Sequence, residues 1–379
     1  MRVLVITNDL PPRIGGIQYY VDQLCRGLAT AGDEVLVFGS TSDGAAEWDA
    51  SAPYDVVRLR TPVMLPGPYT TARALGLVRR HRPDVVVFGA AFPLALMGPI
   101  IRQRTGTPFV AFTHGLEVTS RRAPGGSLPL RLIGRSAAAV TFVSHWCDSE
   151  LRPAFGNGPR YDLLPPAVDP DAFHPGVDGA AVRERLGLGT APAIVCVSRL
   201  VERKGQDTLI RVLPEIRRRV PDTRLVIVGD GPHREALERQ ARERHVDDVV
   251  VFTGKVSDDD LPSHYAAADV FAMLCRERRG GLEVEAFGIV FIQAQAVGVP
   301  VVAGNIGGVA DSLRDGTTGH LVDSTDDADV VRALVDLLSD ESRRRRLGTA
   351  GAELVAHSYT WPERCRQLRD LLASVTETS

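Results

Sequence analysis

Short apolar runs rich in β-branched residues alternate along the chain with longer segments in which apolar residues recur at helical spacing. This alternation is typical of parallel sheets whose faces are covered by helices. We therefore predict an α/β fold. In the first half, strands are expected at 3–6, 34–38, 55–58, 84–88, 108–112 and 139–143, with helices that include 17–31, 70–81 and 93–104.

The second half restarts the pattern. Strands are expected near 193–197, 224–228, 249–252, 269–273 and 300–303, and helices near 204–220, 232–244, 285–297 and 327–338. Between the halves, residues 164–175 contain four prolines, which exclude a continuous helix or a central strand. We predict two doubly wound domains facing each other across a cleft, 1–168 and 169–358, and a helical segment 359–379 that packs back on the first domain.

Size, charge and cysteine usage limit the classes of function. A chain of 379 residues exceeds one ordinary core, which agrees with two domains, and its net charge of −3 argues against a general nucleic-acid binder. The five cysteines contain no C-x-x-C pair, which argues against a zinc site or a disulfide framework. No segment reaches the ~18 apolar residues of a membrane span, and no signal-peptide pattern opens the chain. We expect a cytoplasmic protein, with peripheral membrane contact left open.

Two cations follow the first strand of the second half. Arg199 and Lys204 lie in segment 198–205, directly after the apolar run 193–197. An arginine makes forked contacts to phosphate oxygens, and a lysine adds a mobile charge. If a diphosphate leaves from a sugar, both cations would stabilise the charge that develops on it. The alternative is a solvated basic face, since further arginines surround the pair: Arg203, Arg211, Arg217, Arg218 and Arg219.

The segment from Glu285 to Gln293 supplies the complementary groups. Gly288 permits a close approach of backbone to a ligand, and the amides that follow it would begin a helix and bind an anion. Glu285 can accept hydrogen bonds from sugar hydroxyls, and Gln293 can reach another part of the same ligand. Alternatively, Glu285 caps the helix and Gln293 is incidental.

The first half contributes two weaker candidates. Gly15 and Gly16 precede the first helix, where free amides can bind an anion, although an ordinary strand-to-helix turn would look the same. His114 follows the strand at 108–112 and could donate a hydrogen bond to a sugar or a leaving oxygen, although a lone histidine is often structural.

Several common chemistries lack their motifs. The chain has no G-x-G-x-x-G fingerprint, no P-loop, and no paired carboxylates or Ser/Cys–His set of the kind that hydrolysis through a protein nucleophile requires. Cations for a diphosphate, polar groups for sugar hydroxyls and a helix start together favour a nucleotide-sugar-dependent glycosyltransferase.

The order of these motifs resembles that of the retaining, metal-independent glycosyltransferases of the GT-B fold. It runs Gly-Gly-Ile-Gln, Thr-His-Gly, Pro-Pro-x-Val-Asp, Ser-Arg-Leu-x-x-Arg-Lys-Gly and Glu-x7-Gln, and covers nearly the whole chain. Segments 63–68, 88–91 and 275–285 look most like those of actinobacterial phosphatidylinositol-monomannoside mannosyltransferases that use GDP-mannose.

The resemblance implies GDP-mannose as donor substrate, a glycolipid acceptor, neither a metal ion nor another cofactor, and retention through a front-face path. It assigns catalysis to His114, Arg199, Lys204 and Glu285. Gly16 would contact the diphosphate, Val256 the base through its backbone, Glu285 the mannose hydroxyls, and Gln293 the ribose. The implied donor-binding set is Gly15, Gly16, Arg199, Lys204, Val256, Glu285, Phe287, Gly288, Ile289, Val290 and Gln293.

The chain departs from this pattern at two positions. Gln293 stands where the pattern has a second glutamate, and Leu116 stands where similar enzymes carry a second histidine. We therefore keep two alternatives: a transferase that uses a UDP-sugar and a soluble natural-product or sugar-phosphate acceptor, and a nucleotide-sugar-binding protein with little turnover. Residues 123–130, flanked by Arg121, Arg122, Arg131 and Arg135, form either an ordinary surface loop or a contact with an anionic bilayer.

Overall fold

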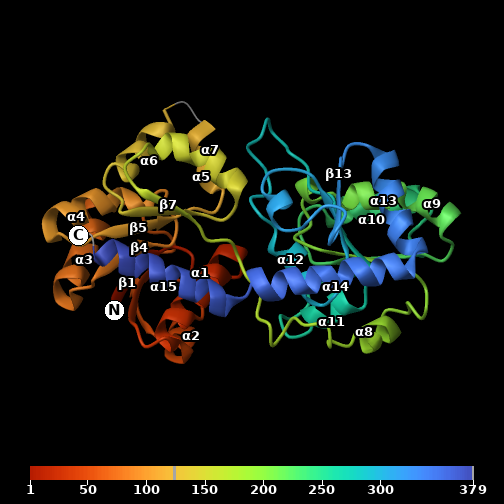
Figure 1. Cartoon of the computed structure of the whole chain (residues 1–379), viewed down its shortest axis with the longest axis horizontal. Coiled ribbons are helices and arrows are strands. Elements are labelled where there is room, and N and C mark those ends of the chain that lie inside the picture. Colours follow the sequence, from red (N-terminus) through yellow and green to blue (C-terminus); the bar gives the residue numbers. More distant parts are fainter. Residues whose placement is uncertain (123–124, 378–379) are drawn as a thin grey trace. The chain divides into compact units, whose positions relative to one another are not determined.

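The computed structural model describes residues 1–122 and 125–377, and its contacts divide the chain into two compact units (Figure 1). Unit 1 contains residues 1–166 together with the segment that begins at Trp361, and unit 2 contains residues 167–360. The division falls two residues before the expected boundary after 168 and two residues beyond the expected boundary after 358. Ala123 and Pro124, which belong to the basic loop of the sequence analysis, lie outside the described residues.

Unit 1 is built on a parallel sheet of seven strands in the order β3-β2-β1-β4-β5-β6-β7. The strands are β1 (Arg2–Thr7), β2 (Glu34–Ser40), β3 (Asp55–Leu59), β4 (Val85–Phe88), β5 (Phe109–Phe112), β6 (Ala139–Phe142) and β7 (Arg160–Leu163). Strands β4, β5 and β6 are buried at every residue, as expected of parallel strands covered on both faces.

The six strands predicted for the first half are present, whereas β7 was not predicted. In β7 the sequence Arg-Tyr-Asp-Leu is only partly buried and carries two charges, so it has no apolar run to recognise. It forms a strand because its backbone pairs with β6 at the edge of the sheet.

Helices of unit 1 connect these strands. They are α1 (Gly16–Thr30), α2 (Ala45–Ser51), α3 (Pro68–His81), η1 (Leu94–Met97), α4 (Gly98–Thr105), α5 (Leu116–Arg122), α6 (Ser127–Gly134) and α7 (His145–Phe155). The predicted helix at 93–104 consists of η1 and α4, which follow one another directly.

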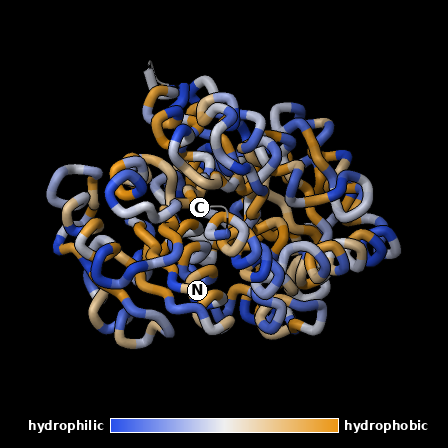
Figure 2. Tube along the Cα trace, turned by 60° about the vertical axis from the view of Figure 1, so that its left-hand side comes forward, coloured by the Kyte–Doolittle hydropathy of each residue, from blue (hydrophilic) through white to orange (hydrophobic). Residues whose placement is uncertain are grey.

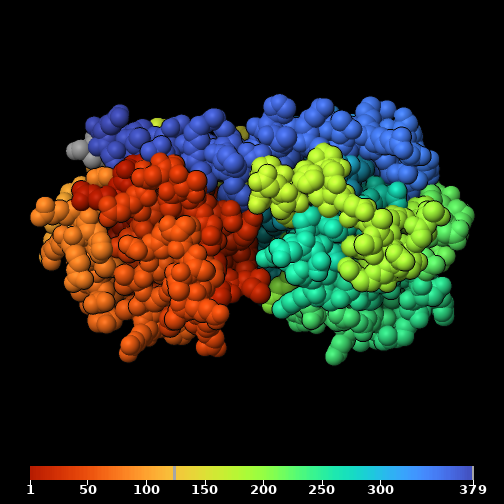
Figure 3. All heavy atoms as spheres, turned by 90° about the horizontal axis from the view of Figure 1, so that it is seen from below, coloured from red at the N-terminus to blue at the C-terminus, as the bar shows by residue number. Residues whose placement is uncertain are grey.

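The last helix, α15 (Trp361–Glu377), belongs to unit 1. It packs along α1, where the rings of Tyr19 and Trp361 meet edge to face at 5.7 Å. Gln367 donates from Nε2 to the carbonyl of Leu163 at 2.7 Å. In the space-filling view the dark blue α15 lies against the red N-terminal segments (Figure 3).

Unit 2 contains a parallel sheet of six strands in the order β10-β9-β8-β11-β12-β13. They are β8 (Ala193–Val197), β9 (Arg224–Val228), β10 (Val250–Gly254), β11 (Val270–Met273), β12 (Val301–Gly304) and β13 (Gly319–Val322). The five predicted strands are present. The edge strand β13 was missed because Gly-His-Leu-Val is short and begins with residues of low strand propensity.

Helices of unit 2 complete the second doubly wound layer structure. They are α8 (Ala180–Arg185), η2 (Glu202–Lys204), α9 (Gln206–Arg219), α10 (Arg234–Glu243), α11 (Leu261–Ala266), α12 (Ile289–Ala296), η3 (Val309–Asp311), α13 (Asp327–Ser339) and α14 (Glu341–Ser358). Apolar segments gather along the strands inside each unit and polar segments along its outside (Figure 2).

Two predicted helices begin later than expected, and glycine is the reason in both. Gly205 has φ 76° and Gly288 has φ 88°, in the left-handed region where a helix cannot continue. The segment expected at 204–220 is therefore divided into η2 and α9. The segment expected at 285–297 becomes a helix only at Ile289.

Each sheet has a point at which the order of its strands reverses. In unit 1 it lies between β1 and β4, and in unit 2 between β8 and β11. Doubly wound sheets bind their ligands beyond the carboxyl ends of the strands at this switch point. Of the helices in the part of the chain that the structure describes, none has the length and hydropathy that spanning a membrane requires.

Candidate functional site

The switch point of unit 2 brings Lys204 and Glu285 into contact. Lys204 ends η2, which follows β8, and Glu285 lies in the segment between β11 and α12. The Lys204 Nζ donates to Glu285 Oε2 at 2.5 Å, and Arg203 Nη1 donates to the same oxygen at 2.7 Å. Two residues 81 positions apart in the chain thus form one ion cluster with Arg203.

This cluster keeps Glu285 ionised. Burial opposes the charge on the carboxylate, but the charges and hydrogen bonds of Lys204 and Arg203 outweigh it and lower the pKa of Glu285 to about 2. Glu285 is not the cap of α12, because Gly288 occupies the N-cap position and no side chain caps that helix. The capping alternative of the sequence analysis is therefore wrong.

Arg199 lies five residues before Lys204, at the carboxyl end of β8. Its side chain is exposed and makes no hydrogen bond or ion pair with any residue that the structure describes. The main chain around it is fixed, because the buried Gln206 donates from Nε2 to Ser198 Oγ at 2.7 Å and to the Arg199 carbonyl at 3.2 Å. The main chain at Arg199 is therefore held in place, while no described residue pairs with its guanidinium.

The start of α12 lies immediately after Glu285. Gly308 donates its backbone N–H to the Glu285 carbonyl at 2.9 Å, which fixes the approach to the helix. A Cβ on Gly288 would lie 2.5 Å from the ring of Phe291, so the turn requires glycine for space as well as for φ. The first amides of α12, at Ile289 and Val290, have no partner within the helix.

Phe287 contributes packing at this turn. Its side chain is 3% exposed, and its ring lies 5.7 Å from that of Tyr359. Only its backbone remains available to a ligand, whereas the side chain anchors the start of α12.

Gln293 is engaged by a buried tyrosine. Tyr265, which is fully buried on α11, donates its hydroxyl to Gln293 Oε1 at 2.9 Å. This bond directs the amide oxygen toward Tyr265 and leaves the two N–H donors of Nε2 for a ligand. Val256 lies farther along the sheet, beyond the edge strand β10 and two strands away from β8. Its role as the base contact stays a prediction.

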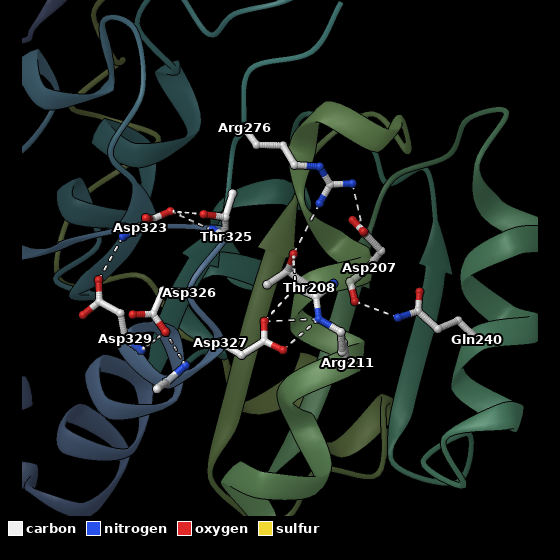
Figure 4. A network of polar contacts seen from close by, with 11 residues as sticks. Asp207, Thr208, Arg211, Gln240, Arg276, Asp323, Thr325, Asp326, Asp327 and Asp329 are labelled. Carbon is white, nitrogen blue, oxygen red and sulfur yellow. Dashed lines mark hydrogen bonds and ion pairs between the residues drawn. The ribbon is translucent and has the colours of Figure 1, made fainter.

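A polar network ties the segment after β11 to the start of α9 (Figure 4). Arg276 donates to Asp207 Oδ2 at 2.8 Å and to Thr208 Oγ1 at 3.3 Å. Arg211 contacts the same threonine at 3.3 Å and pairs with Asp327 at the start of α13 at 2.7 Å. Arg211 is thus part of a network rather than a free solvated cation.

The switch point of unit 1 carries the glycine pair. Gly15 is the N-cap of α1, which begins at Gly16. A Cβ on Gly16 would meet no atom within 4 Å, so the fold of this unit leaves open space at that position. A Cβ on Gly15 would meet the flexible end of the Gln18 side chain. The first amides of α1 have no partner within the helix and are available to an anion.

His114 lies beyond β5 and is held as a neutral imidazole. Its Nε2 lies 2.6 Å from the Gly89 carbonyl oxygen, which can only accept, so Nε2 carries the proton. Burial lowers the pKa of His114 to about 4, although the bond to Gly89 opposes this shift. The donor of the ring is therefore already used, and Nδ1 remains as an acceptor. The expectation that His114 donates to a ligand does not fit this geometry.

Buried Glu117 supports the same loop. Its side chain is 1% exposed and accepts the backbone N–H of His114 at 3.1 Å. Burial raises the pKa of Glu117, while bonds from backbone amides, including those of Ala91 and Phe92, lower it. Glu117 is committed to the backbone and is unsuited to act as a catalytic base.

Four residues of the site were not predicted from sequence: Arg203, Gln206, Tyr265 and Glu117. Arg203 was assigned to a basic face because its neighbours in sequence are cationic, and only the fold shows its bond to Glu285. Tyr265 lies outside every motif, and nothing in its local sequence points to Gln293. No metal-binding group of three or more His, Cys, Asp or Glu residues occurs among the described residues.

Comparisons with known proteins agree with the two-unit architecture. A model of Glycosyltransferase Family 4 matches residues 14–172, and a model of Glycosyl transferases group 1 matches residues 180–354. Among solved structures, sucrose-phosphate synthase from Thermosynechococcus elongatus superposes with a TM-score of 0.84 at 24% identity and covers 100% of both chains. Anabaena HepE in complex with UDP gives 0.84 at 19% identity, covering 99% of this chain and 100% of that one.

Three curated relatives are similar over nearly the whole chain. The chain is 46% identical to the GDP-mannose-dependent alpha-(1-6)-phosphatidylinositol monomannoside mannosyltransferase of Mycolicibacterium smegmatis, covering 99% of each chain. It is 44% identical to the protein of that name in Mycobacterium tuberculosis, covering 98% of each. It is 40% identical to a GDP-mannose-dependent monoacylated alpha-(1-6)-phosphatidylinositol monomannoside mannosyltransferase of Corynebacterium glutamicum, again covering 98% of each.

Proposed function

The chain belongs to the glycosyltransferases of family 4 and group 1, with the GT-B fold, and on that premise we propose that it transfers mannose from GDP-mannose to a phosphatidylinositol-mannoside acceptor. One observation carries the transfer chemistry: Arg199, whose guanidinium no described residue engages, follows the same strand, β8, as Lys204, which pairs with Glu285. The identity of 46% to a mannosyltransferase along 99% of both chains supports the choice of substrates.

In this proposal the donor diphosphate lies between Arg199, Lys204 and the first amides of α12. Lys204 uses one of its three N–H donors on Glu285 and keeps the others for phosphate oxygens. Negative charge grows on the diphosphate as the sugar leaves, so the cations stabilise the transition state more than the ground state. The open space at Gly16 lets the backbone of unit 1 approach an anion in the same manner.

Glu285 and Gln293 hold the two ends of the donor. The ionised carboxylate of Glu285 accepts hydrogen bonds from mannose hydroxyls, and the Nε2 donors of Gln293 reach the oxygens of the ribose. Val256 contacts the base through its backbone. His114 offers Nδ1 as an acceptor to a hydroxyl of the sugar or of the acceptor.

We assign no protein side chain as the base. The acceptor hydroxyl oxygen attacks the anomeric carbon from the face that the diphosphate leaves, while the bond between that carbon and the phosphate oxygen breaks. The hydroxyl proton passes to an oxygen of the departing phosphate. The commitment of Glu117 to backbone amides agrees with this path, because this carboxyl group beside His114 is not available to remove the proton.

Peripheral contact with an anionic membrane forms the second part of the proposal. Leu128 and Leu132 lie one turn apart on α6 and are 71% and 47% exposed. Arg131 lies on the same helix, and Arg135 is its C-cap residue. Arg121 is partly engaged, since it pairs with Glu150 at 2.8 Å. An exposed apolar pair beside two cations suits the interface of a bilayer that contains the lipid acceptor.

Transfer assays distinguish the proposal from its alternatives. The enzyme should transfer mannose from GDP-mannose to a phosphatidylinositol-mannoside and show little transfer from UDP-glucose. Preferential turnover of UDP-glucose with a soluble acceptor would favour the alternative hypothesis of a UDP-sugar-dependent transferase. Tight binding of a nucleotide sugar without turnover on any acceptor would favour a binding protein, a reading motivated by Gln293.

Liposome flotation tests the membrane contact. The Arg131→Gln/Arg135→Gln double variant should float with anionic vesicles about thirtyfold more weakly, because each of the two cations near the surface contributes ~1 kcal/mol. The matched control, Arg218→Gln/Arg219→Gln, removes two exposed cations from α9 in unit 2 and should float like the wild type. Equal flotation of both double variants would contradict the assignment to α6.

A further inference from the structure

The Glu285 carboxylate is bound unevenly. Its Oε2 receives three donors: Lys204 Nζ at 2.5 Å, Arg203 Nη1 at 2.7 Å and Cys275 Sγ at 3.8 Å. No described residue donates a hydrogen bond to its other oxygen, Oε1. The side chain of Glu285 is 13% exposed, so part of this otherwise enclosed group remains open to a ligand.

The three donors come from two segments that the fold holds firmly together. Arg203 and Lys204 belong to η2, and Cys275 follows β11. Arg276 donates its backbone N–H to the Arg203 carbonyl at 3.0 Å, and Ser324 Oγ donates to the Cys275 carbonyl at 2.9 Å. The donors that surround Oε2 are therefore set before any ligand binds.

We propose that Arg203 and Cys275 are positioning residues that occupy Oε2 of Glu285 and thereby present Oε1 to a hydroxyl of the donor sugar. The inference rests on the proposed function, because it needs a sugar bound at Glu285. Arg203 and Cys275 touch neither sugar nor diphosphate in this arrangement and act through Glu285.

Arg203 also sets the charge of the cluster. Lys204 alone already balances the charge of Glu285, so Arg203 adds a second positive charge at a carboxylate that is already paired. With Arg203, two cations share one carboxylate, and the cluster carries one net positive charge. Arg203 therefore keeps Glu285 ionised and holds its Oε2, while the diphosphate still has Arg199 and the remaining donors of Lys204.

Cys275 contributes the weaker contact. Its thiol is 1% exposed, and burial raises its pKa to about 12, so the sulfur keeps its proton and can only donate to the carboxylate. A thiol is a weak donor, and its loss should disturb the orientation of Glu285 less than the loss of Arg203.

Titration of GDP-mannose and of GDP against the same variants tests the assignment. Arg203→Gln should weaken GDP-mannose by about tenfold, the scale of a lost hydrogen bond to a charged group, and GDP by no more than about threefold. Arg203→Lys should weaken GDP-mannose binding less than Arg203→Gln does, since lysine keeps the positive charge but is shorter than arginine. Cys275→Ala should weaken GDP-mannose by about twofold.

The pH dependence of kcat/KM gives a readout that a purely structural role would not move. Arg203 stabilises the ionised form of Glu285, so Arg203→Gln should shift the acid limb of the profile to higher pH. Arg278→Gln is the matched control, because Arg278 lies in the segment after β11 that carries Cys275 but pairs with Glu202 and not with Glu285. This control should leave the acid limb in place.

The possible results distinguish a failure of the proposed function from a failure of the positioning role of Arg203. A wild-type protein that neither binds nor turns over GDP-mannose overturns the proposed function. A wild-type protein that works while Arg203→Gln behaves like Arg278→Gln overturns the positioning role alone, as does an equal loss for GDP and GDP-mannose. If Arg203→Gln does not fold, Arg203→Lys decides: wild-type affinity and an unshifted acid limb would contradict the assignment.

Discussion

Unit 1 and unit 2 form their switch points from the same kind of doubly wound sheet but place different side chains there. In unit 2 the loops after β8 and β11 carry the guanidinium of Arg199, which pairs with no described residue, and an ion cluster around Glu285. In unit 1 the loop after β1 carries Gly15 and Gly16, and β5, the neighbour of β4, is followed by a histidine that burial keeps neutral. Unit 2 thus provides charged side chains. Unit 1 provides backbone amides, open space at Gly16 and a neutral histidine that can accept a hydrogen bond.

The exposed apolar side chains divide in the same way. Among the described residues, the large hydrophobic side chains that are strongly exposed fall almost entirely in unit 1, with Leu282 the exception in unit 2. Those of unit 1 are Ile14, Val63, Leu65, Tyr69, Ile100, Leu116, Leu128 and Leu132. A unit that exposes apolar groups suits a lipid acceptor, and a unit with a fixed ion cluster suits a nucleotide diphosphate.

Removal of the charges of unit 2 should have the largest effect. Arg199→Ala and Lys204→Ala should each lower turnover by ~10²-fold or more, the scale of losing a transition-state charge partner. Steady-state kinetics with GDP-mannose measure this loss, with Arg219→Ala on the exposed part of α9 as the control. Near-wild-type rates in both variants would show that the diphosphate does not bind at this switch point.

Alanine at the two helix-start glycines should separate binding from folding. Gly16→Ala should keep the melting temperature, because its Cβ has open space, and should weaken donor binding by about tenfold by blocking the approach of the diphosphate. Gly288→Ala should lower stability by about 1–3 kcal/mol, since φ is 88° and the Cβ would meet the Phe291 ring.

Thermal unfolding and donor titration of both variants provide the measurement. The comparison between the units would fail if Gly16→Ala lost stability as Gly288→Ala does, because unit 1 would then need its glycine for the fold and not for a ligand.

Protonation of His114 in unit 1 and of Glu285 in unit 2 should affect the stability of the protein in different pH ranges. His114 has a folded pKa of about 4 against an ordinary 6.5, so the unfolded chain binds this proton more tightly and stability falls as pH decreases from 6.5 toward 4. Glu285 has a folded pKa of about 2 against 4.5, and its stabilising contribution is lost only as pH falls below 4.5.

His114→Gln should therefore reduce the drop in melting temperature between pH 7 and pH 5, while Glu285→Gln should leave that drop as it is in the wild type. Melting curves of the three proteins at both pH values test this difference. An unchanged drop in His114→Gln would remove the argument for a neutral imidazole.

The smallest effect is expected at Gln293. A carboxylate there would accept the Tyr265 bond and still offer an ionised acceptor to ribose hydroxyls, so Gln293→Glu should tighten GDP binding by about fivefold. Calorimetric titration measures the change, and Tyr265→Phe, which loses the hydroxyl, serves as the comparison. An unchanged dissociation constant would count against the ribose placement.

Local patterns sufficed for the architecture and for part of the site. Apolar runs such as Val85–Phe88 and Ala193–Val197 could be recognised because parallel strands covered on both faces are buried at every residue and read as short β-branched runs. The edge strands β7 and β13 escaped prediction since pairing with a neighbour, and not burial, makes them strands.

The residues of the site divide along the same line. Arg199, Lys204 and Glu285 were found because their types and positions after strands already indicate phosphate and sugar chemistry. Arg203, Cys275 and Tyr265 were not, since each acts on a partner brought close by the sheet, 82, 10 and 28 positions away in the chain.

The sequence alone therefore determined the two doubly wound sheets, the proline-rich connection between them and the types of residue at the candidate site. Tertiary structure decided which oxygen of Glu285 accepts the hydrogen bond of Lys204. It also decided that the N–H of His114 donates to the Gly89 carbonyl and that the Tyr265 hydroxyl donates to Gln293. Hydrophobic spacing is a local property of the chain, whereas hydrogen bonds between loops depend on where the sheet places the ends of its strands.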